Sequence, residues 1–199
     1  MEHLQQHDWW FSIIGARTVP DGVMGSALHA NGLAVGRDYP EDLQRYRQET
    51  AGKVLIAGPN TARFVLPQHG TLGRDVMIAG RRAPNTVPYT QPTLEAAIAA
   101  VDDGVFGEGR ESVVIGGPTM IRGACELVRR ANFPVDSGKR ALLLLTEFYD
   151  TTIPRRYEND NSAPTLADLP DNVREELRIR QPNTIPGRPD YDFAWYSVG

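Results

Sequence analysis

Five short apolar segments, most of them continuous rather than alternating, constrain the fold of this chain most strongly. They occupy positions 11–16, 54–57, 76–79, 113–115 and 141–145. Continuous apolar strands are typical of a parallel sheet that helices cover on both faces. The three middle segments are each followed directly by a glycine, which indicates a turn at the carboxyl end of the strand.

Helical patterns lie between these segments, so strands and helices alternate along most of the chain. In the first pattern, Leu43, Tyr46 and Thr50 share one face. The expected helices are 40–50, which opens on Pro40, a segment between a capping Thr93 and Gly104, and one from about Pro118 that carries Met120, Ala124 and Leu127 inward. This alternation implies crossover connections and an α/β fold with a mostly parallel sheet.

The C-terminal part has a different character. Positions 151–190 are polar and rich in proline, with one short helix expected near 172–179. Positions 191–198 form an aromatic alternating pattern, which predicts a strand that closes the sheet edge antiparallel to the strand before it. We expect one domain over 1–199, with a polar N-terminal extension at 1–8 and a polar insert at 151–190.

Composition excludes several classes of protein. The net charge of -4 gives no bulk attraction to nucleic acid or anionic lipid, and no apolar run reaches membrane-spanning length. The single cysteine, Cys125, is expected to be a core residue and cannot form an intrachain disulfide. The four histidines lack metal-ligand spacing, so no metal is expected. We expect a cytoplasmic protein, monomer or homodimer, that binds neither nucleic acid nor membrane.

Three turns at the expected strand ends are candidates for ligand binding, because open parallel sheets bind ligands outside the carboxyl ends of their strands. Gly116 and Gly117 precede a helix start that could hold a phosphate, although paired glycines also occur as plain turn residues. Thr61 could either cap a helix or bind a phosphate. Arg81 and Arg82 either suit a phosphomonoester or form a solvated basic turn.

Asp42 is the carboxylate with the clearest chemical potential. It lies in the first turn of the expected helix, where an acid commonly stabilises the helix dipole. It is also next to Leu43 and one turn before Tyr46, so it could face an apolar pocket as a ligand anchor that handles protons. Both interpretations stay open. Together with the turns, Asp42 indicates a phosphate-bearing cofactor spread across the strand ends.

The string YPEDLQRYRQET at 39–50, followed by Gly52-Lys53-Val54, closely resembles the segment of dihydrofolate reductases that carries the active-site acid. The resemblance covers roughly 11–150, with a weaker echo at 191–196. Further matching segments, in the order of that family, are 11–16, 21–25, 58–61, 73–74, 115–117 and 145–147. The resemblance implies a mainly parallel eight-stranded sheet flanked by about four helices, with an antiparallel C-terminal strand.

Carried over position by position, the resemblance implies specific roles. Asp42 would bind the amino-pyrimidine edge of a heterocycle and promote protonation of its imine nitrogen, supported by a hydrogen bond from Thr146. The implied substrate-binding residues are Ile14, Ala16, Arg37, Leu43, Tyr46 and Arg74, of which Arg74 would hold a folate carboxylate. The implied NADPH-binding residues are Ala16, Met24, Gly25, Gly58, Thr61, Arg81, Arg82, Ile115, Gly116, Gly117 and Ile121, with Arg81 and Arg82 at the 2′-phosphate. In the family, a cis bond joins the pair that matches Gly116 and Gly117.

Three positions depart from the family pattern. Gly36-Arg37 stand where relatives carry Pro-Trp, Pro59 replaces an arginine, and Ile121 replaces a tyrosine near the nicotinamide. Arg37 and Ile121, in place of two aromatic residues, imply a pocket that is reshaped for a different ring.

The resemblance implies an NADPH-dependent enzyme that transfers a hydride to a protonated C=N bond in a small heterocyclic substrate. The first hypothesis is reduction of 7,8-dihydrofolate to tetrahydrofolate, in one-carbon metabolism. The second is reduction of an imine, iminium or hemiaminal in a specialised metabolite, for biosynthesis or for self-resistance by inactivation. The third is a non-catalytic nucleotide-binding protein, which the retention of Asp42 and Thr146 disfavours.

Overall fold

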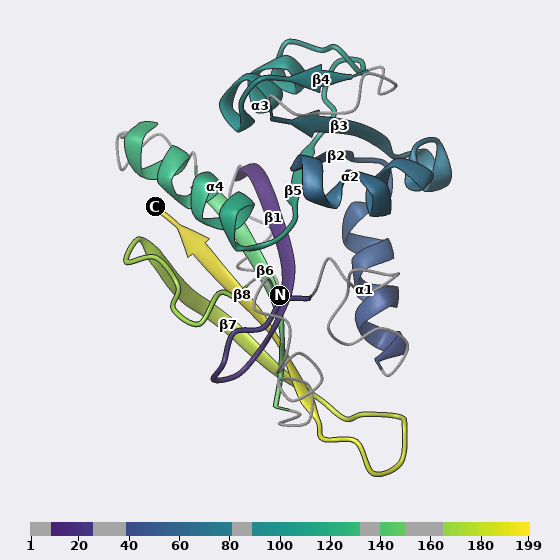
Figure 1. Cartoon of the computed structure of the whole chain (residues 1–199), viewed down its shortest axis with the longest axis vertical. Coiled ribbons are helices and arrows are strands. Elements are labelled where there is room, and N and C mark those ends of the chain that lie inside the picture. The colour runs from purple at the N-terminus through teal and green to yellow at the C-terminus, as the bar shows by residue number, and fades with distance from the viewer. Residues whose placement is uncertain (1–8, 26–38, 81–88, 132–139, 150–164) are drawn as a thin grey trace.

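The computed structural model describes residues 9–25, 39–80, 89–131, 140–149 and 165–199. The strands in these residues are β1 (Trp9–Thr18), β2 (Val54–Ala57), β3 (Asp75–Ala79), β4 (Thr90–Gln91), β5 (Ser112–Ile115), β6 (Arg140–Phe148), β7 (Val173–Gln181) and β8 (Tyr191–Val198). They form one eight-stranded sheet in the order β4-β3-β2-β5-β1-β6-β8-β7 (Figure 1).

Most of this sheet is parallel. Among the described strands, only the pairs β6–β8 and β7–β8 are antiparallel. In central β1, Ile13 pairs with Val114 of β5 and with Leu143 of β6. All five apolar segments are strands, and β8 pairs antiparallel with β6, as predicted. The expected mainly parallel eight-stranded sheet is therefore confirmed.

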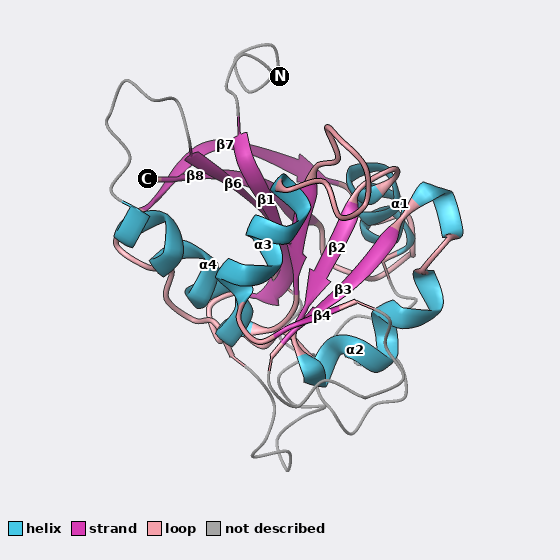
Figure 2. Cartoon of the chain, turned by 90° about the horizontal axis from the view of Figure 1, so that it is seen from above, coloured by secondary structure: helices cyan, strands magenta, loops and turns pink. Residues whose placement is uncertain are grey.

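The described residues also form four helices, in two layers on opposite faces of the sheet (Figure 2). The helices are α1 (Pro40–Thr50), α2 (Pro59–Val65), α3 (Leu94–Asp102) and α4 (Pro118–Ala131), and two short 3-10 turns are η3 (Leu66–Gln68) and η4 (Thr71–Gly73). Val65 of α2 packs with β2, β3 and β5 in one core cluster, which Tyr46 of α1 borders. Ile98 of α3 and Ala124 of α4 pack in a second cluster on the other face.

Local sequence explains where these helices start. Pro40 is the first residue of α1, and the Thr93 side chain accepts a hydrogen bond from the backbone N–H of Ala96 at the start of α3 (3.1 Å), as predicted. The expected inner face of α1 is partly wrong, because Leu43 is 41% exposed whereas Arg45 and Thr50 are buried. Arg45 thus occupies an inner position that hydrophobic periodicity alone does not predict.

The helix expected near 172–179 is wrong, because this segment lies in strand β7. β7 forms the edge of the sheet outside β8, so the edge is closed by a β7–β8 pair and not by β8 alone. A register shift between Glu175 and Leu177 places Val173 and Leu177 opposite Val198 and Trp195, on different faces of the sheet.

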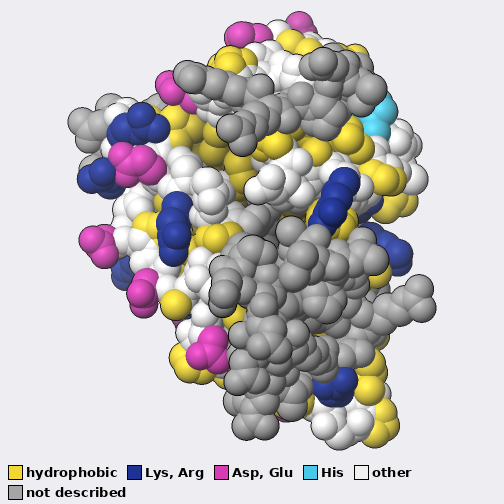
Figure 3. All heavy atoms as spheres, viewed as in Figure 1, with side chains coloured by type: hydrophobic (Ala, Val, Ile, Leu, Met, Phe, Trp, Pro, Cys, Tyr) yellow, Lys and Arg dark blue, Asp and Glu magenta, His cyan; other side chains and the backbone are white. Residues whose placement is uncertain are grey.

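The surface of the described part mixes apolar and charged side chains. On the face in Figure 3, hydrophobic side chains gather in the upper part, and basic and acidic side chains alternate along the left flank. None of the described helices is long and apolar enough to cross a membrane. Cys125 is buried in α4, as predicted, and burial raises the pKa of its thiol to about 12.

Candidate functional site

The acid expected from the sequence lies at the junction of α1 and β6. Thr146 Oγ1 of β6 donates a hydrogen bond to Oδ1 of Asp42, in the first turn of α1, over 2.5 Å. In the sheet register, Thr146 pairs with Ala16 of β1. Three residues that the resemblance assigns to one site therefore lie together in the structure.

The surroundings of Asp42 favour its protonated form. Asp42 keeps some exposed surface, but the protein surrounds its carboxyl closely enough that burial raises the pKa of Asp42. The hydrogen bond from Thr146 and the charge of Arg45 act in the opposite direction and do not outweigh burial. A carboxyl with a raised pKa can carry a proton nearer neutral pH, as general acid catalysis requires.

A buried arginine beside this acid is a feature that sequence reasoning missed. Arg45 is 6% exposed, and its Nη1 donates to a backbone carbonyl of β6 (3.1 Å) and approaches Thr146 Oγ1 at 3.4 Å. Its Cζ lies 4.3 Å from the ring centroid of Phe193 and 4.5 Å from that of Trp195. The spacing of three positions from Asp42 is the signal that could have placed Arg45 on the same helix face.

Met24 and Ile121, which the resemblance assigns to the cofactor site, pack closely against the middle of β1. A Cβ at Gly15 would lie 3.1 Å from Met24 Cε and 3.1 Å from Ile121 Cδ1. Ile14 and Ala16 are the neighbours of Gly15 in the strand. Their side chains therefore point to the opposite face of the sheet from Met24 and Ile121. Met24 and Ile121 are thus buried together in the core on one face of β1, on the opposite side of the strand from Ile14 and Ala16.

The turn between β5 and α4 brings two expected phosphate ligands together. Gly116 has φ 151°, and a Cβ there would lie 3.1 Å from Met120 Cγ and 3.4 Å from Thr61 Oγ1. The absence of a side chain at Gly116 therefore allows Met120 at the start of α4 and the Thr61 hydroxyl to pack closely against this turn.

Two expectations about these turns are wrong. The described residues contain one cis peptide bond, between Val19 and Pro20, so the bond between Gly116 and Gly117 is not cis. The positive φ of Gly116 turns the chain at this point instead. Thr61 does not cap α2, because Gly58 is the N-cap residue and Thr61 lies inside the helix.

The glycines at the strand ends fit a long phosphate-bearing cofactor. Gly58, Gly80 and Gly116 follow the neighbouring parallel strands β2, β3 and β5. A Cβ at Gly80 would lie 2.7 Å from Pro59 Cγ, so two turns approach each other closely. The start of α4 faces the same edge of the sheet, although Pro118 has no N–H and the N–H of Met120 bonds to the carbonyl of Gly117. This edge could hold the phosphates of a dinucleotide.

Tyr46 and Arg74 form a separate cluster further along α1. Tyr46 OH donates to Gln68 Oε1 (2.9 Å), and Arg74 Cζ lies 5.4 Å from the Tyr46 ring centroid. Arg74 is 4% exposed and donates to the backbone carbonyl of Arg47 (3.1 Å) and to Gln68 (3.5 Å). Its Nη1 and Nη2 therefore already have partners within the protein, whereas its Nε is buried without a hydrogen-bond partner among the described residues.

The remaining candidates divide into placed and unplaced residues. Arg37, Arg81 and Arg82 lie outside the described residues. Ile115 pairs with Ile14 in the sheet, and the buried Gly25 follows Met24. Gly117 accepts the backbone hydrogen bond of Met120 at the start of α4. Within the part of the chain that is described, no group of three His, Cys, Asp or Glu side chains could hold a metal ion.

A loop beside the site is fixed by a segment from the far end of the chain. The carbonyl of Gly22 accepts a hydrogen bond from the N–H of Leu166 (2.7 Å). Arg17 Nη1 donates to the carbonyls of Leu166 and Ala167, each at 2.9 Å. Because Met24 follows this contact by two residues, the segment 165–167 helps to position Met24 over β1.

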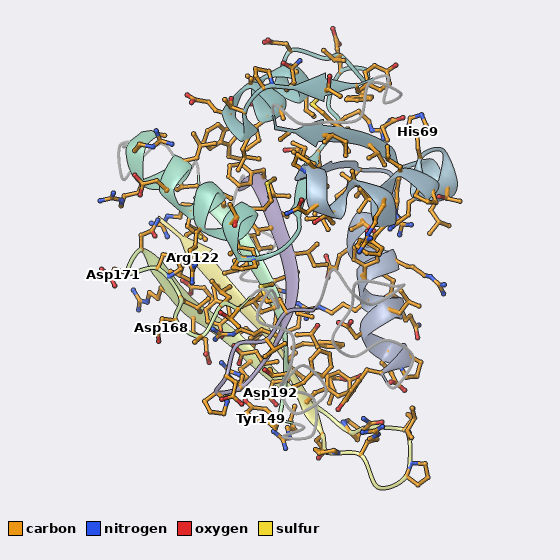
Figure 4. The ribbon with its side chains drawn as sticks, in the orientation of Figure 1. His69, Arg122, Tyr149, Asp168, Asp171 and Asp192 are labelled. Carbon is orange, nitrogen blue, oxygen red and sulfur yellow. The ribbon has the colours of Figure 1, made fainter. Side chains whose placement is uncertain are left out.

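A buried ionic cluster lies on the opposite face of β6 from Thr146. Glu147 is 2% exposed, forms an ion pair with Arg17 (2.6 Å) and another with Arg178. Asp192 accepts hydrogen bonds from Arg178 and from Tyr149, and Figure 4 shows Tyr149 and Asp192 side by side. The cluster connects β1, β6, β7 and β8 and therefore has a structural role.

Comparisons with known proteins agree with this architecture. No protein-family model matches the sequence, and no curated protein matches it. Among solved structures, the chain is similar to a dihydrofolate reductase from Enterococcus faecalis complexed with NADP(H) and RAB-propyl. The TM-score is 0.58, the sequence identity is 16%, and 94% of each chain is covered. The chain therefore has a dihydrofolate reductase-like fold.

Proposed function

We propose that this chain is an NADPH-dependent reductase that transfers a hydride to a protonated C=N bond in a small heterocycle. One observation carries the proposal. The carboxyl of Asp42, hydrogen-bonded by Thr146 and raised in pKa by burial, lies toward the same carboxyl edge of the sheet as the glycine turn that follows β5 at Gly116. An acid for a ring nitrogen and a phosphate-compatible turn thus share one edge.

In this proposal, the chain's own residues handle the proton and the orientation of the ring. Protonated Asp42 donates its proton to the imine nitrogen, and the resulting carboxylate stabilises the cationic ring until the hydride neutralises it, after which solvent returns a proton to Asp42. Thr146 holds the carboxyl in one orientation through its hydrogen bond. Ile14 and Ala16 supply an apolar wall that excludes water from the reacting atoms.

The structural neighbour that was solved with NADP(H) supports the choice of cofactor. When bound, NADPH supplies the hydride. Gly58, Thr61 and Gly116 would hold its phosphates through backbone and hydroxyl groups. Met24 and Ile121 pack in the core against Gly15, on the opposite face of β1 from Ile14 and Ala16, so they would support this strand from behind.

The first candidate substrate is 7,8-dihydrofolate, in keeping with the fold. One observation favours the second candidate, an imine, iminium or hemiaminal in another metabolite. Arg74, the residue expected to hold a folate carboxylate, is 4% exposed and already donates to Gln68 and to the backbone of Arg47. A folate tail would have to displace these contacts, whereas a substrate without a carboxylate tail would not.

A turnover assay separates these candidates. NADPH oxidation would be measured with dihydrofolate and with a panel of cyclic imines and hemiaminals, each with and without methotrexate. Turnover of dihydrofolate that methotrexate inhibits identifies the first candidate, and turnover of cyclic imines alone identifies the second. NADPH binding without any turnover would indicate a non-catalytic nucleotide-binding protein, and absence of NADPH binding would reject the proposal.

A further inference from the structure

The proposed reaction leaves one feature of its site unexplained, the buried positive charge beside the acid. We propose that Arg45 is a built-in counter-charge to Asp42, which makes the ring site select uncharged heterocycles over cationic ones. The effect of Arg45 on Asp42 follows from their placement alone, whereas its effect on ligands rests on the function proposed above.

Arg45 and Asp42 share a hydrogen-bond partner. They are three positions apart in α1, so their side chains project from the same face of the helix. Thr146 Oγ1 donates to Asp42 Oδ1 at 2.5 Å and lies 3.4 Å from Arg45 Nη1. The Thr146 hydroxyl therefore bridges the cation and the acid, and the three groups form one polar unit between α1 and β6.

Aromatic rings hold the Arg45 guanidinium in place. Its Cζ lies 4.3 Å from the Phe193 ring centroid and 4.5 Å from that of Trp195, which are two positions apart in β8 and share one face of the strand. A flat guanidinium stacks on such rings, whereas an ammonium does not match them in shape. With the additional bond to a β6 carbonyl (3.1 Å), the charge is fixed and is not free to swing into solvent.

The charge of Arg45 is poorly compensated except by Asp42 and its neighbours on α1. Nε and Nη2 are buried and have no hydrogen-bond partner among the residues described. The carboxylates whose charges act on Arg45 are Glu49, which has the larger effect, and Asp42, both on α1. Burial lowers the pKa of Arg45 to about 10, so the side chain remains charged at neutral pH.

This arrangement changes which ligands the acid attracts. A lone buried carboxylate draws a cationic ring toward it, because opposite charges interact strongly where the effective dielectric is low. With Arg45 beside it, the charge of the ionised acid is partly offset, and a ring that brings its own positive charge meets the repulsion of Arg45. The preferred substrate class is therefore a heterocycle that enters uncharged and receives its proton only once bound.

Two matched substitutions on α1 test this inference. Arg45→Met removes the charge and keeps an apolar side chain of similar length under the rings, while Arg47→Met removes an exposed charge two positions away. The first readout is the titration midpoint of the Asp42 carboxyl, followed by carbon-13 NMR in the free protein and assigned with Asp42→Asn. The second is the ratio of affinities for a basic 2,4-diaminopyrimidine and its neutral 2-amino-4-oxo counterpart.

We expect Arg45→Met to raise the Asp42 midpoint by about one pH unit and to shift the affinity ratio about tenfold toward the basic ring. Arg47→Met should change neither. An Asp42 midpoint and an affinity ratio that are both unchanged in Arg45→Met would overturn the inference. The carboxyl titration decides the role of Arg45 as a counter-charge even if the chain reduces no C=N bond.

The unmodified protein provides a test that does not depend on a variant folding. At a pH above both the measured Asp42 midpoint and the pKa of the free diaminopyrimidine, a site that disfavours cations should bind it without taking up a proton. Calorimetry in two buffers of different ionisation enthalpy measures that uptake. Uptake of a full proton by the unmodified protein would contradict the inference, and its absence would support it.

Discussion

Thr146 and Asp42 are separated by 104 positions in the sequence, yet a hydrogen bond of 2.5 Å joins them. The strand next to central β1 therefore orients the acid that the first helix provides. Because Thr146 also pairs with Ala16 in the sheet, the position of the acid is tied to the middle of the sheet and not to a surface loop.

Replacing this acid should separate binding from chemistry. Asp42→Asn keeps the shape of the side chain but removes the proton donor, so we expect NADPH binding to persist and turnover at neutral pH to fall about 100-fold. Steady-state NADPH oxidation and a cofactor titration would measure the two effects. Glu108→Gln, at an exposed position, is the control. Unchanged turnover in Asp42→Asn would remove Asp42 from the mechanism.

The pH dependence of turnover should respond to Thr146. Burial raises the pKa of Asp42 and the Thr146 hydrogen bond lowers it, so Thr146→Val should raise that pKa further. A reaction that needs protonated Asp42 slows as pH rises through this pKa, and its alkaline limb should therefore move upward by about one pH unit in the variant. A pH profile of turnover under substrate saturation measures the shift. A limb that stays in place would show that another group controls it.

Glu147 should govern stability rather than chemistry. Burial raises its pKa, but hydrogen bonds and charges from Arg178 and Arg17 outweigh burial and hold the pKa of Glu147 below that of an ordinary glutamate. Since the folded protein binds this proton less readily than the unfolded chain, the stabilisation is present above about pH 4.5 and is lost as pH falls through the folded pKa.

Glu147→Gln should therefore lower the free energy of unfolding by about 3 kcal/mol at neutral pH, because it leaves buried arginine charge unpaired. The difference from the unmodified protein should shrink in acid. Urea unfolding from about pH 3 to 7 measures both effects. Glu126→Gln, which breaks exposed pairs on α4, should change stability far less. A pH-independent difference for Glu147→Gln would contradict the assignment.

Sequence reasoning predicts the parallel part of this fold because its strands are apolar and its helices carry start signals. It fails at β7, where local and tertiary preferences disagree. Val173 and Leu177 are four positions apart among glutamates and arginines, which favours a helix locally. The bulge before Leu177 and the pairing with β8 make the segment an edge strand instead.

The candidate site shows the same division. Motif order identifies Asp42, Thr146 and the Gly116 turn, and the structure places the first two in contact. Arg45 is missed because a pattern search for apolar faces treats an arginine as solvent-exposed, whereas aromatic rings of β8 accommodate it. Such pairing between α1 and the last strand depends on the folded sheet and leaves no local trace in sequence.

The contact between Gly22 and the segment 165–167 should be intolerant of any side chain. Gly22 has φ 69°, and a Cβ there would lie 2.2 Å from the backbone nitrogen of Ala167. Gly22→Ala should lower the free energy of unfolding by about 2 kcal/mol more than Gly52→Ala, and should also slow turnover by displacing Met24. Gly52 has φ 72° but nothing within 4 Å of its Cβ position, so it isolates the backbone strain. Equal effects of the two substitutions would contradict a close packing role.

Cofactor affinity should depend on the geometry of the turn at Gly116. A methyl group there would lie 3.1 Å from Met120 Cγ and 3.4 Å from Thr61 Oγ1, so it would displace the start of α4 or the Thr61 hydroxyl that is expected to hold a phosphate. Gly116→Ala should therefore weaken NADPH binding about tenfold or more, measured by fluorescence titration. Gly107→Ala serves as the matched control, because Gly107 also has positive φ (100°) and an open Cβ position in a surface turn. If both variants bind NADPH as tightly as the unmodified protein, the phosphates lie elsewhere along the strand ends.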